Sequence, residues 1–269
     1  MAYRTILAPY ARLVSAQIRS QAQYRTSFVI DLVSQTIFTV LEFTTVFVMF
    51  QVTPTLGGFD FVEVLLISSL SISGFTLADL LVGNVERLSM YVRTGLLDSV
   101  LIRPRRVLPQ LLAVDFQLRR VGRVGFSVAV LVLAAAAAKL DWTWWRVVLV
   151  VVTPLTAAAF FSAVFVMTAT TTFWWIEARE FANSFTYGGR DFTTYPLTIY
   201  GTGFRRIFGH ALGFGFVAYY PALVLLGRQD PLGAPTWLGW AGAPIAFLAV
   251  GLAAFLWRLG VRHYKGTGS

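Results

Sequence analysis

The feature that most constrains this chain is a series of long apolar runs that recur along its whole length. The runs cover residues 28–50, 61–82, 113–138, 147–173, 207–226 and 238–257. An α-helix rises 1.5 Å per residue, so each run can cross a hydrocarbon layer of about 30 Å. Hydrophobic residues make up 57% of the chain and charged residues 13%, well below the charged share of a soluble domain. We therefore predict an all-α membrane protein in which residues 1–269 form a single transmembrane domain with six spans.

The positions of the positive charges predict the orientation of these spans. The chain carries 22 Lys+Arg and 13 Asp+Glu. If the N-terminus lies inside and the chain crosses six times, all but three of the basic residues fall in inside segments; the exceptions are Lys139, Arg146 and Arg228. Cytoplasmic loops are enriched in Lys and Arg. Both termini are therefore predicted to be cytoplasmic, and the basic charge calls for no nucleic-acid partner.

The flanking segments complete the domain layout. Residues 1–27 place arginines among apolar residues at helical spacing, which predicts an interfacial helix, with a plain solvated lead-in as the alternative. Spans one and two then occupy 28–82, a polar segment 83–106, spans three to six 107–257, and a basic cytoplasmic tail 258–269. The first apolar run starts only near Phe28 and no small-residue cleavage site follows it, so we predict no signal peptide.

The residue types exclude several kinds of chemistry. The chain has no cysteine and two histidines, which argues against a thiolate or histidine metal site. It contains no glycine-rich loop ending in Lys-Ser/Thr, the loop that cradles nucleotide phosphates. No pairing of a nucleophile with a base is apparent either. We therefore predict no enzymatic activity and no bound cofactor, so that energy for any active process comes from a partner protein or an ion gradient.

Polar residues in the first span are candidates for a substrate pathway. Asp31, Gln35, Thr39 and Glu42 are spaced by four, four and three residues, which places them on one face of a helix. A carboxylate in hydrocarbon is costly unless it faces protein or water, so Glu42 should face the interior of the bundle. The face could line a cavity that attracts a cationic substrate, or it could pair with another helix. Pairing is favoured for Asp31, which can reach the interface. Asp79, near the end of span two, is expected to anchor the following loop.

The polar segment 83–106 is the most informative part of the chain. Its residues 90–102 alternate apolar and charged side chains in the pattern of an amphipathic helix, and Pro104 is expected to end that helix. A short cytoplasmic helix between two spans can act as a lever, because a partner that pushes on it moves both spans. The alternative is an inert solvated loop.

Two sequence patterns resemble one family. The stretch RTGLLDSVLIRP (93–104) resembles the arginine–glycine–aspartate–leucine–arginine–proline stretch of bacterial ABC-2 type transporter permeases, of the uncharacterised or viologen-exporter-like kind. The stretch from FTTYPLTIYGTGFRRIF to AYYPALVLLG (192–227) resembles a second signature of that family. With the six-span layout, the resemblance covers essentially the whole chain.

The resemblance implies a permease subunit of an ATP-driven exporter in the bacterial cytoplasmic membrane. It implies a dimeric cytoplasmic ABC ATPase, which holds ATP and Mg, and a second six-span permease of the same or a related kind. The segment after span two would be the coupling helix that docks on the ATPase. By position, the contact would be made by Glu86, Arg87, Arg93, Asp98 and Arg103.

The resemblance also offers a second arrangement for the fifth span. Charge counting places 174–206 inside and makes 207–226 the fifth span. The family's architecture instead places a span near 178–200, followed by a re-entrant hairpin on the outer side, which would leave Arg205 and Arg206 outside. The glycine-rich run 209–215 suits a broken helix, although Gly209 and Gly213 could equally mark a close helix contact. We favour the re-entrant arrangement slightly.

Two other function classes compete with an exporter permease. An ion-gradient transporter or channel usually carries several ionisable residues within its spans and internal repeats, whereas Glu42 is the one deep carboxylate here and no repeat is apparent. A non-catalytic membrane scaffold is the other class. The substrate is not encoded in any recognisable motif, and cationic drugs, lipids, glycolipids and peptides all remain open.

Overall fold

The computed structural model describes residues 13–264 except 22, 24, 105, 115, 116 and 176, and every regular element in that part is helical. The elements are α2 (Arg25–Val52), α3 (Phe61–Val82), η1 (Gly83–Arg87), α4 (Leu88–Arg93), α5 (Leu96–Leu101), α6 (Val107–Val114), η2 (Leu118–Arg120), α7 (Val121–Ala137), α8 (Trp144–Thr170), η3 (Thr171–Phe173), α9 (Arg179–Thr194), η4 (Leu197–Ile199), α10 (Thr202–Phe204), η5 (Arg205–Ala211), η6 (Phe214–Phe216), α11 (Tyr219–Leu226), η7 (Thr236–Trp240) and α12 (Gly242–His263).

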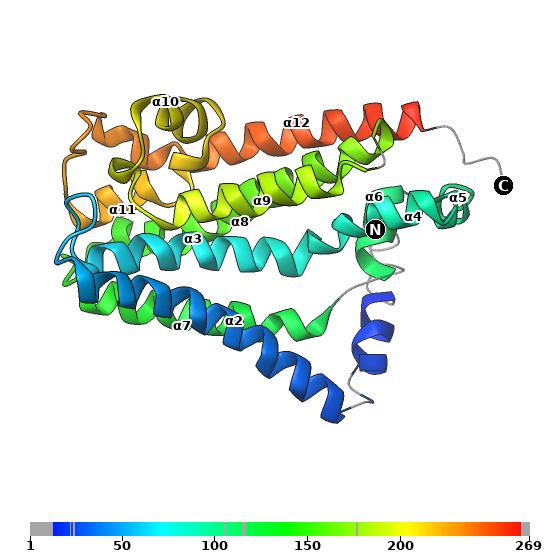
Figure 1. Ribbon diagram of the computed structural model, residues 1–269, viewed down its shortest axis with the longest axis horizontal. Helices are drawn as coiled ribbons and strands as arrows, with labels where there is room; N and C mark the ends of the chain where they lie inside the picture. The colour runs from blue at the N-terminus through cyan, green and yellow to red at the C-terminus, as the bar shows by residue number, and fades with distance from the viewer. Residues whose placement is uncertain are drawn as a thin grey trace.

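The long helices run side by side along the longest axis of the molecule (Figure 1). They are α2, α3, α7, α8, α9 and α12. We call the end that holds α4, α5, α6 and the last turn of α12 the α4 end, and the opposite end, with α10 and α11, the α11 end. Within the described residues, five helices are long and apolar enough to cross a membrane: α2, the stretch from α3 to α4, the stretch from η2 to α7, α8 with η3, and α12. They lie within the predicted spans or overlap them closely.

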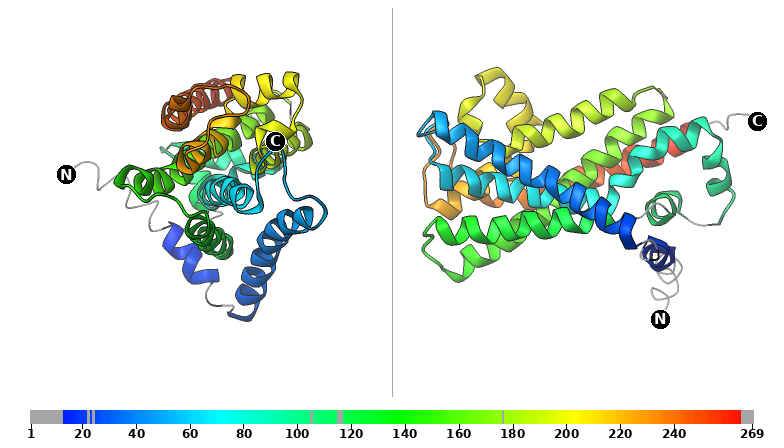
Figure 2. Two further views of the ribbon diagram at one scale, coloured as in Figure 1. Left: turned by 90° about the vertical axis from the view of Figure 1, so that its left-hand side faces the viewer. Right: turned by 60° about the horizontal axis from the view of Figure 1, so that its bottom comes forward.

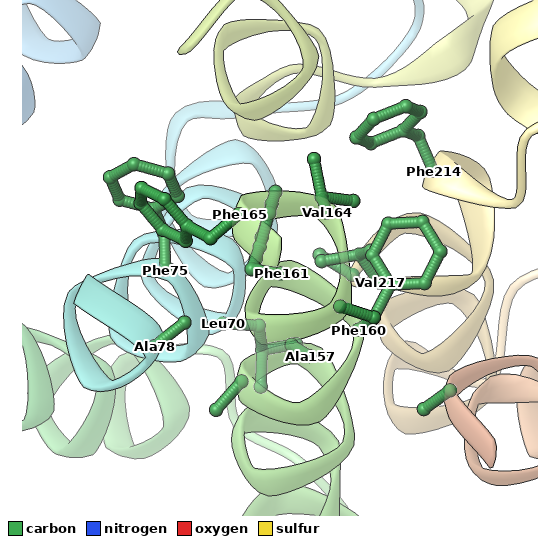
Figure 3. Close-up of a cluster of buried hydrophobic side chains, with 14 of the residues drawn as sticks. Leu70, Phe75, Ala78, Ala157, Phe160, Phe161, Val164, Phe165, Phe214 and Val217 are labelled. Atoms are coloured by element: carbon green, nitrogen blue, oxygen red, sulfur yellow. The ribbon is translucent and has the colours of Figure 1, made fainter. Parts of the chain in front are cut away.

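Helix α3 is the centre of the bundle. Protein surrounds it, since 78% of its most apolar window is buried, against 17% for α2. The close-up in Figure 3 places Phe75 and Ala78 of α3 against Phe161 and Phe165 of α8. The Phe75 and Phe161 rings meet edge to face with 5.2 Å between their centroids. Loss of this contact would therefore disturb the middle of the molecule.

Helix α9 runs lengthwise but is polar, because its buried face forms hydrogen bonds with its neighbours. Helix α9 runs beside α3 and α8, where hydroxyl groups meet across the interface. The Ser71 and Thr193 hydroxyls are 2.6 Å apart, and the Ser68 hydroxyl donates to the Thr194 carbonyl at 2.8 Å. In α8, the hydroxyl of Thr168 lies 3.1 Å from that of Thr186. Side-chain hydrogen bonds of this kind hold helices together where lipid surrounds them.

The segment after α9 does not form the single straight helix considered for 207–226. Instead, Thr202–Ala211 and Phe214–Leu226 meet at an angle of 69°, and both halves lie at the α11 end (Figure 1). Gly213 makes the bend, with a φ of +85° that suits glycine. Aromatic contacts hold the first half against α9, since the Phe192 ring lies 5.2 Å from the Phe204 ring and 5.9 Å from the Phe208 ring, centroid to centroid. The lengthwise course of α9 suits a span near 178–200 with a bent segment after it, whereas by length and composition the bent pair is the sixth candidate span.

The N-terminal stretch crosses the end of the bundle. Residues 13–21 are helical and lie crosswise to α2 (Figure 2). The Gln17 amide donates to the Val114 carbonyl, and the Leu118 backbone N–H donates to the Gln21 side chain at 3.0 Å. These contacts suit the predicted interfacial helix. Residues 1–12 of that prediction, and 265–269 of the predicted tail, lie outside the described part.

Candidate functional site

A buried cluster of ion pairs joins the long helices near the α4 end. Asp79 of α3, whose side chain is 3% exposed, is its centre. One carboxylate oxygen lies 3.0 Å from Arg120 and the other 3.1 Å from Arg123. Both arginines come from the start of the third span, so Asp79 ties that span to α3 rather than only anchoring the loop after its own helix. A buried charge is tolerated when it is paired in this way.

Glu42 of α2 extends the cluster to a fourth helix. Its carboxylate forms an ion pair with Arg190 of α9 and lies 3.9 Å from Arg123. The Arg190 guanidinium also sits over the Phe75 ring, 5.1 Å from its centroid, a favourable cation–π position. The cluster thus connects α2, α3, α7 and α9. Its two carboxylates are matched by three guanidinium groups, so the negative charge of Glu42 is already balanced within the protein.

The predicted polar face of α2 is turned toward this cluster. Thr39 is fully buried and accepts a hydrogen bond from Arg123 at 3.3 Å. Asp31, half exposed, pairs with Arg119 at 3.2 Å, which is the interfacial pairing favoured for it. Gln35 is half-buried between them. The face is therefore a helix contact in this conformation, and its role in a substrate pathway stays a prediction.

The predicted coupling segment is two short helices rather than one. Helix α4 ends at Arg93 and α5 begins at Leu96, because Gly95 adopts a left-handed φ of +69° that breaks the expected helix over 90–102. The chain leaves helical geometry after Leu101, before Pro104, as expected. Leu97 and Val100 are buried and hold α5 against the bundle. The result is a compact helix–turn–helix at the α4 end (Figure 1).

The outer surface of this helix–turn–helix is basic and partly apolar. Arg87, Arg93 and Arg103 are exposed, and Asp98 is half-buried. Leu96 and Ile102 lie on the same helix–turn–helix with 47% and 84% of their surface exposed. Exposed apolar side chains with charged neighbours are typical of a protein–protein contact. Arg87, Arg93 and Arg103 are thus exposed at this end, and contact of this surface with an ATPase stays a prediction.

Glu86 differs from these three arginines. It is half-buried, and its carboxylate faces α9, where it accepts a hydrogen bond from the Tyr187 hydroxyl at 3.4 Å. The neighbouring residues Ser89, Thr168 and Asn183 line a small enclosed space beside it. The inward direction follows from its position in η1, where the tight turn brings the side chain against the bundle. In this conformation Glu86 faces the bundle, and its contact with a partner stays a prediction.

The helix–turn–helix is joined to the ion cluster without a flexible linker. Helix α3 continues through η1 into α4, and Gly83 sits where they meet. A Cβ at Gly83 would come within 2.2 Å of the Asp79 carboxylate and of the Arg120 guanidinium, so η1 passes directly over the cluster. Displacement of α4 would therefore also displace the residues of the ion cluster that hold α3, α7 and α9 together. Sequence reasoning missed Arg120, Arg123 and Arg190. For Arg120 and Arg123, charges inside the apolar run 113–138 were a usable signal.

Comparison with protein families identifies the class of protein to which this helical bundle, with its ion cluster and its helix–turn–helix, belongs. The family model described as ABC-2 family transporter protein matches residues 36–268, most of the chain. The chain belongs to the ABC-2 transporter family. No curated protein matched it in a sequence comparison. The ABC-2 family confirms the resemblance seen in the sequence and makes this protein an integral membrane permease of the ABC transporter class.

Proposed function

We propose that this ABC-2 permease forms half of an ATP-driven exporter, together with a second six-span permease and a dimeric cytoplasmic ABC ATPase. The chain contains no nucleotide-binding loop of its own, so ATP and Mg are assigned to the partner. The observation that carries the proposal is the exposed helix–turn–helix α4–α5, which is continuous with the most buried helix of the bundle. A protein that moves α4–α5 moves the core.

Docking on the ATPase is assigned to the basic outer surface of α4–α5. Arg93 and Arg103 provide charge, and Leu96 and Ile102 provide apolar surface. When the two ATPase subunits close, they push α4, and the force passes through Gly83 to the cluster around Asp79. The helices that share this cluster then change their relative positions, which opens the pathway between the two permeases to the outer side.

The proposed location is the bacterial cytoplasmic membrane, with both termini in the cytoplasm. The distribution of Lys and Arg supports this orientation. With α9 as the fifth span, Arg205 and Arg206 lie at the α11 end, which is then the outer end. All but five of the 22 basic residues still fall on the inner side, so the charge rule gives the same orientation for either arrangement of the fifth span.

The test measures ATP hydrolysis by the reconstituted complex. The permease is co-expressed with the ATPase and permease encoded beside it, purified and placed in liposomes. We expect Arg93→Glu, which reverses an exposed charge on α4, to abolish permease-dependent ATPase activity while the complex still assembles. Asp98→Asn should weaken it. Arg206→Glu, an exposed arginine at the opposite end, is the matched control and should leave the activity unchanged.

Two results would count against the proposal. Normal permease-dependent ATPase activity in both the Arg93 and Asp98 variants would contradict the assignment of α4–α5 as the docking surface for the ATPase. Failure of any ATPase to bind, with transport driven by an ion gradient in liposomes that lack ATP, would favour the ion-gradient class. Stimulation of the ATPase by members of a compound panel would narrow the substrate class.

A further inference from the structure

A groove at the α4 end lies apart from the ion cluster and from the α4–α5 surface. It has a volume of about 590 Å³, the size of a typical small-molecule site. Its walls come from three helices and are mainly apolar: Ala163 and Val166 of α8, Ala253 and Trp257 of α12, and Val107 and Leu108 of α6.

Three arginines stand at the mouth of the groove. Arg106 precedes α6, and Arg258 and Arg262 lie in the last turns of α12. All three side chains are exposed, and no lining residue is acidic. Within the described part of the chain, their guanidinium groups make no ion pair and no hydrogen bond. The arginines of the ion cluster are paired, whereas these three give the mouth of the groove a positive charge that no lining residue balances.

The groove opens onto the surface that faces hydrocarbon. Ala254 and Val250 line it and are exposed, and they continue into the exposed apolar face of α12, where Phe247 and Phe255 are 79% and 57% exposed. Arg258 follows Ala254 by one helical turn, and Arg262 by two, so the charges lie about 6 and 12 Å beyond it along the axis. The groove therefore offers apolar walls that an acyl chain can enter from the bilayer, and cations just beyond them where the headgroup of the same phospholipid would lie.

We propose that this groove binds an anionic phospholipid from the leaflet at the α4 end. Arg106, Arg258 and Arg262 hold the headgroup phosphate, and one acyl chain lies against Ala163, Ala253 and Trp257. Basic pockets between membrane helices on the cytoplasmic side have the chemistry to bind such headgroups. The site is separate from the docking surface of the proposed function and does not depend on it.

Occupancy of the groove has a structural consequence. Helix α6 follows α5 directly and packs against α5 and η1. A lipid between α6 and α12 therefore braces the base of the helix–turn–helix against the last span. We expect the bound lipid to stabilise the α4 end of the purified permease.

The experiment titrates phosphatidylglycerol, and phosphatidylcholine with the same acyl chains, onto the detergent-purified full chain and counts bound lipids by native mass spectrometry. We expect wild-type protein to prefer phosphatidylglycerol. The triple variant Arg106→Gln, Arg258→Gln, Arg262→Gln should bind it roughly 100-fold more weakly, since each basic residue contributes about fivefold. The control, Arg93→Gln, Arg103→Gln, Arg206→Gln, removes the same charge from exposed arginines elsewhere and should change binding little.

A second variant tests the acyl-chain half of the site without changing charge. Ala254→Trp adds a large ring to an exposed position in the groove and should also abolish the preference. Excess inorganic phosphate should not displace the lipid, because a free anion gains nothing from the apolar walls. The proposal is overturned if the arginine triple variant binds phosphatidylglycerol as tightly as wild type, or if phosphatidylcholine binds equally well. A second copy of the chain could instead cover the groove. The proposal is therefore also overturned if Ala254→Trp breaks a dimer of the chain but leaves lipid binding intact.

Discussion

At the scale of single residues, the strongest prediction concerns Asp79. Asp79→Asn keeps the shape of the side chain but leaves Arg120 and Arg123 as buried charges with too little negative charge around them. Removal of one partner of a buried ion pair costs about 3 kcal/mol. We expect the melting midpoint of the detergent-purified protein to fall by several degrees. Asp141→Asn is the control, because the Asp141 carboxylate is 95% exposed in its pair with Arg146, and it should melt like wild type.

The same residues indicate how far sequence reasoning reaches. The spacing of Thr39 and Glu42 places them on one helix face, and the cost of a lone carboxylate in lipid predicts that Glu42 faces protein. Both expectations hold. The partner Arg190 could not be found in this way, because it lies far along the chain on a helix whose own register was unknown. Helical periodicity fixes a face, whereas ion-pair partners depend on how separate helices pack.

At the scale of elements, the contact between α3 and α8 depends on Gly74. A Cβ at this position would lie 2.3 Å from the Ala157 Cβ, closer than two carbons can approach, so Gly74→Ala should push the helices apart and cost about 1–3 kcal/mol. Ala157→Gly in the same chain should restore part of the loss. The control Gly125→Ala adds the same methyl group to α7, where nothing lies within 4 Å. Equal melting of the Gly74 and Gly125 variants would contradict the close contact.

Helix α9 is the element that hydropathy alone could not locate. Its 16 residues include Arg179, Glu180, Arg190 and Asp191. A search for long apolar stretches therefore rejects α9 and selects 207–226 instead. The compensating signal lies in its neighbours, since α3 contains SSLSIS at 68–73 and the end of α8 with the start of η3 reads TATTT at 168–172. Hydroxyl groups in apolar spans form hydrogen bonds between helices, and α9 supplies such partners to Ser68, Ser71 and Thr168. The family resemblance pointed to a span near 178–200 because it did not depend on hydropathy.

At the scale of the whole molecule, the topology can be tested because the chain has no cysteine. Single cysteines can be placed at exposed positions and labelled with a maleimide that does not cross membranes. Thr55 and Gln229 lie in loops at the α11 end, and Ser99 lies on α5 at the α4 end. In intact cells we expect Thr55→Cys and Gln229→Cys to react, and Ser99→Cys to react only after permeabilisation.

Gly203→Cys decides between the two arrangements of the fifth span. Gly203 is exposed in α10, and a side chain there meets nothing within 4 Å, so the substitution should not disturb the fold. If α9 crosses the membrane and the bent segment stays at the outer end, this cysteine reacts in intact cells, like those at positions 55 and 229. If 174–206 were an inside segment, it would behave like Ser99→Cys. The first result also requires Arg205 and Arg206 to lie outside. The hydrogen-bonded contact of α9 with α3 and α8 would then outweigh the tendency of these two arginines to stay on the inner side.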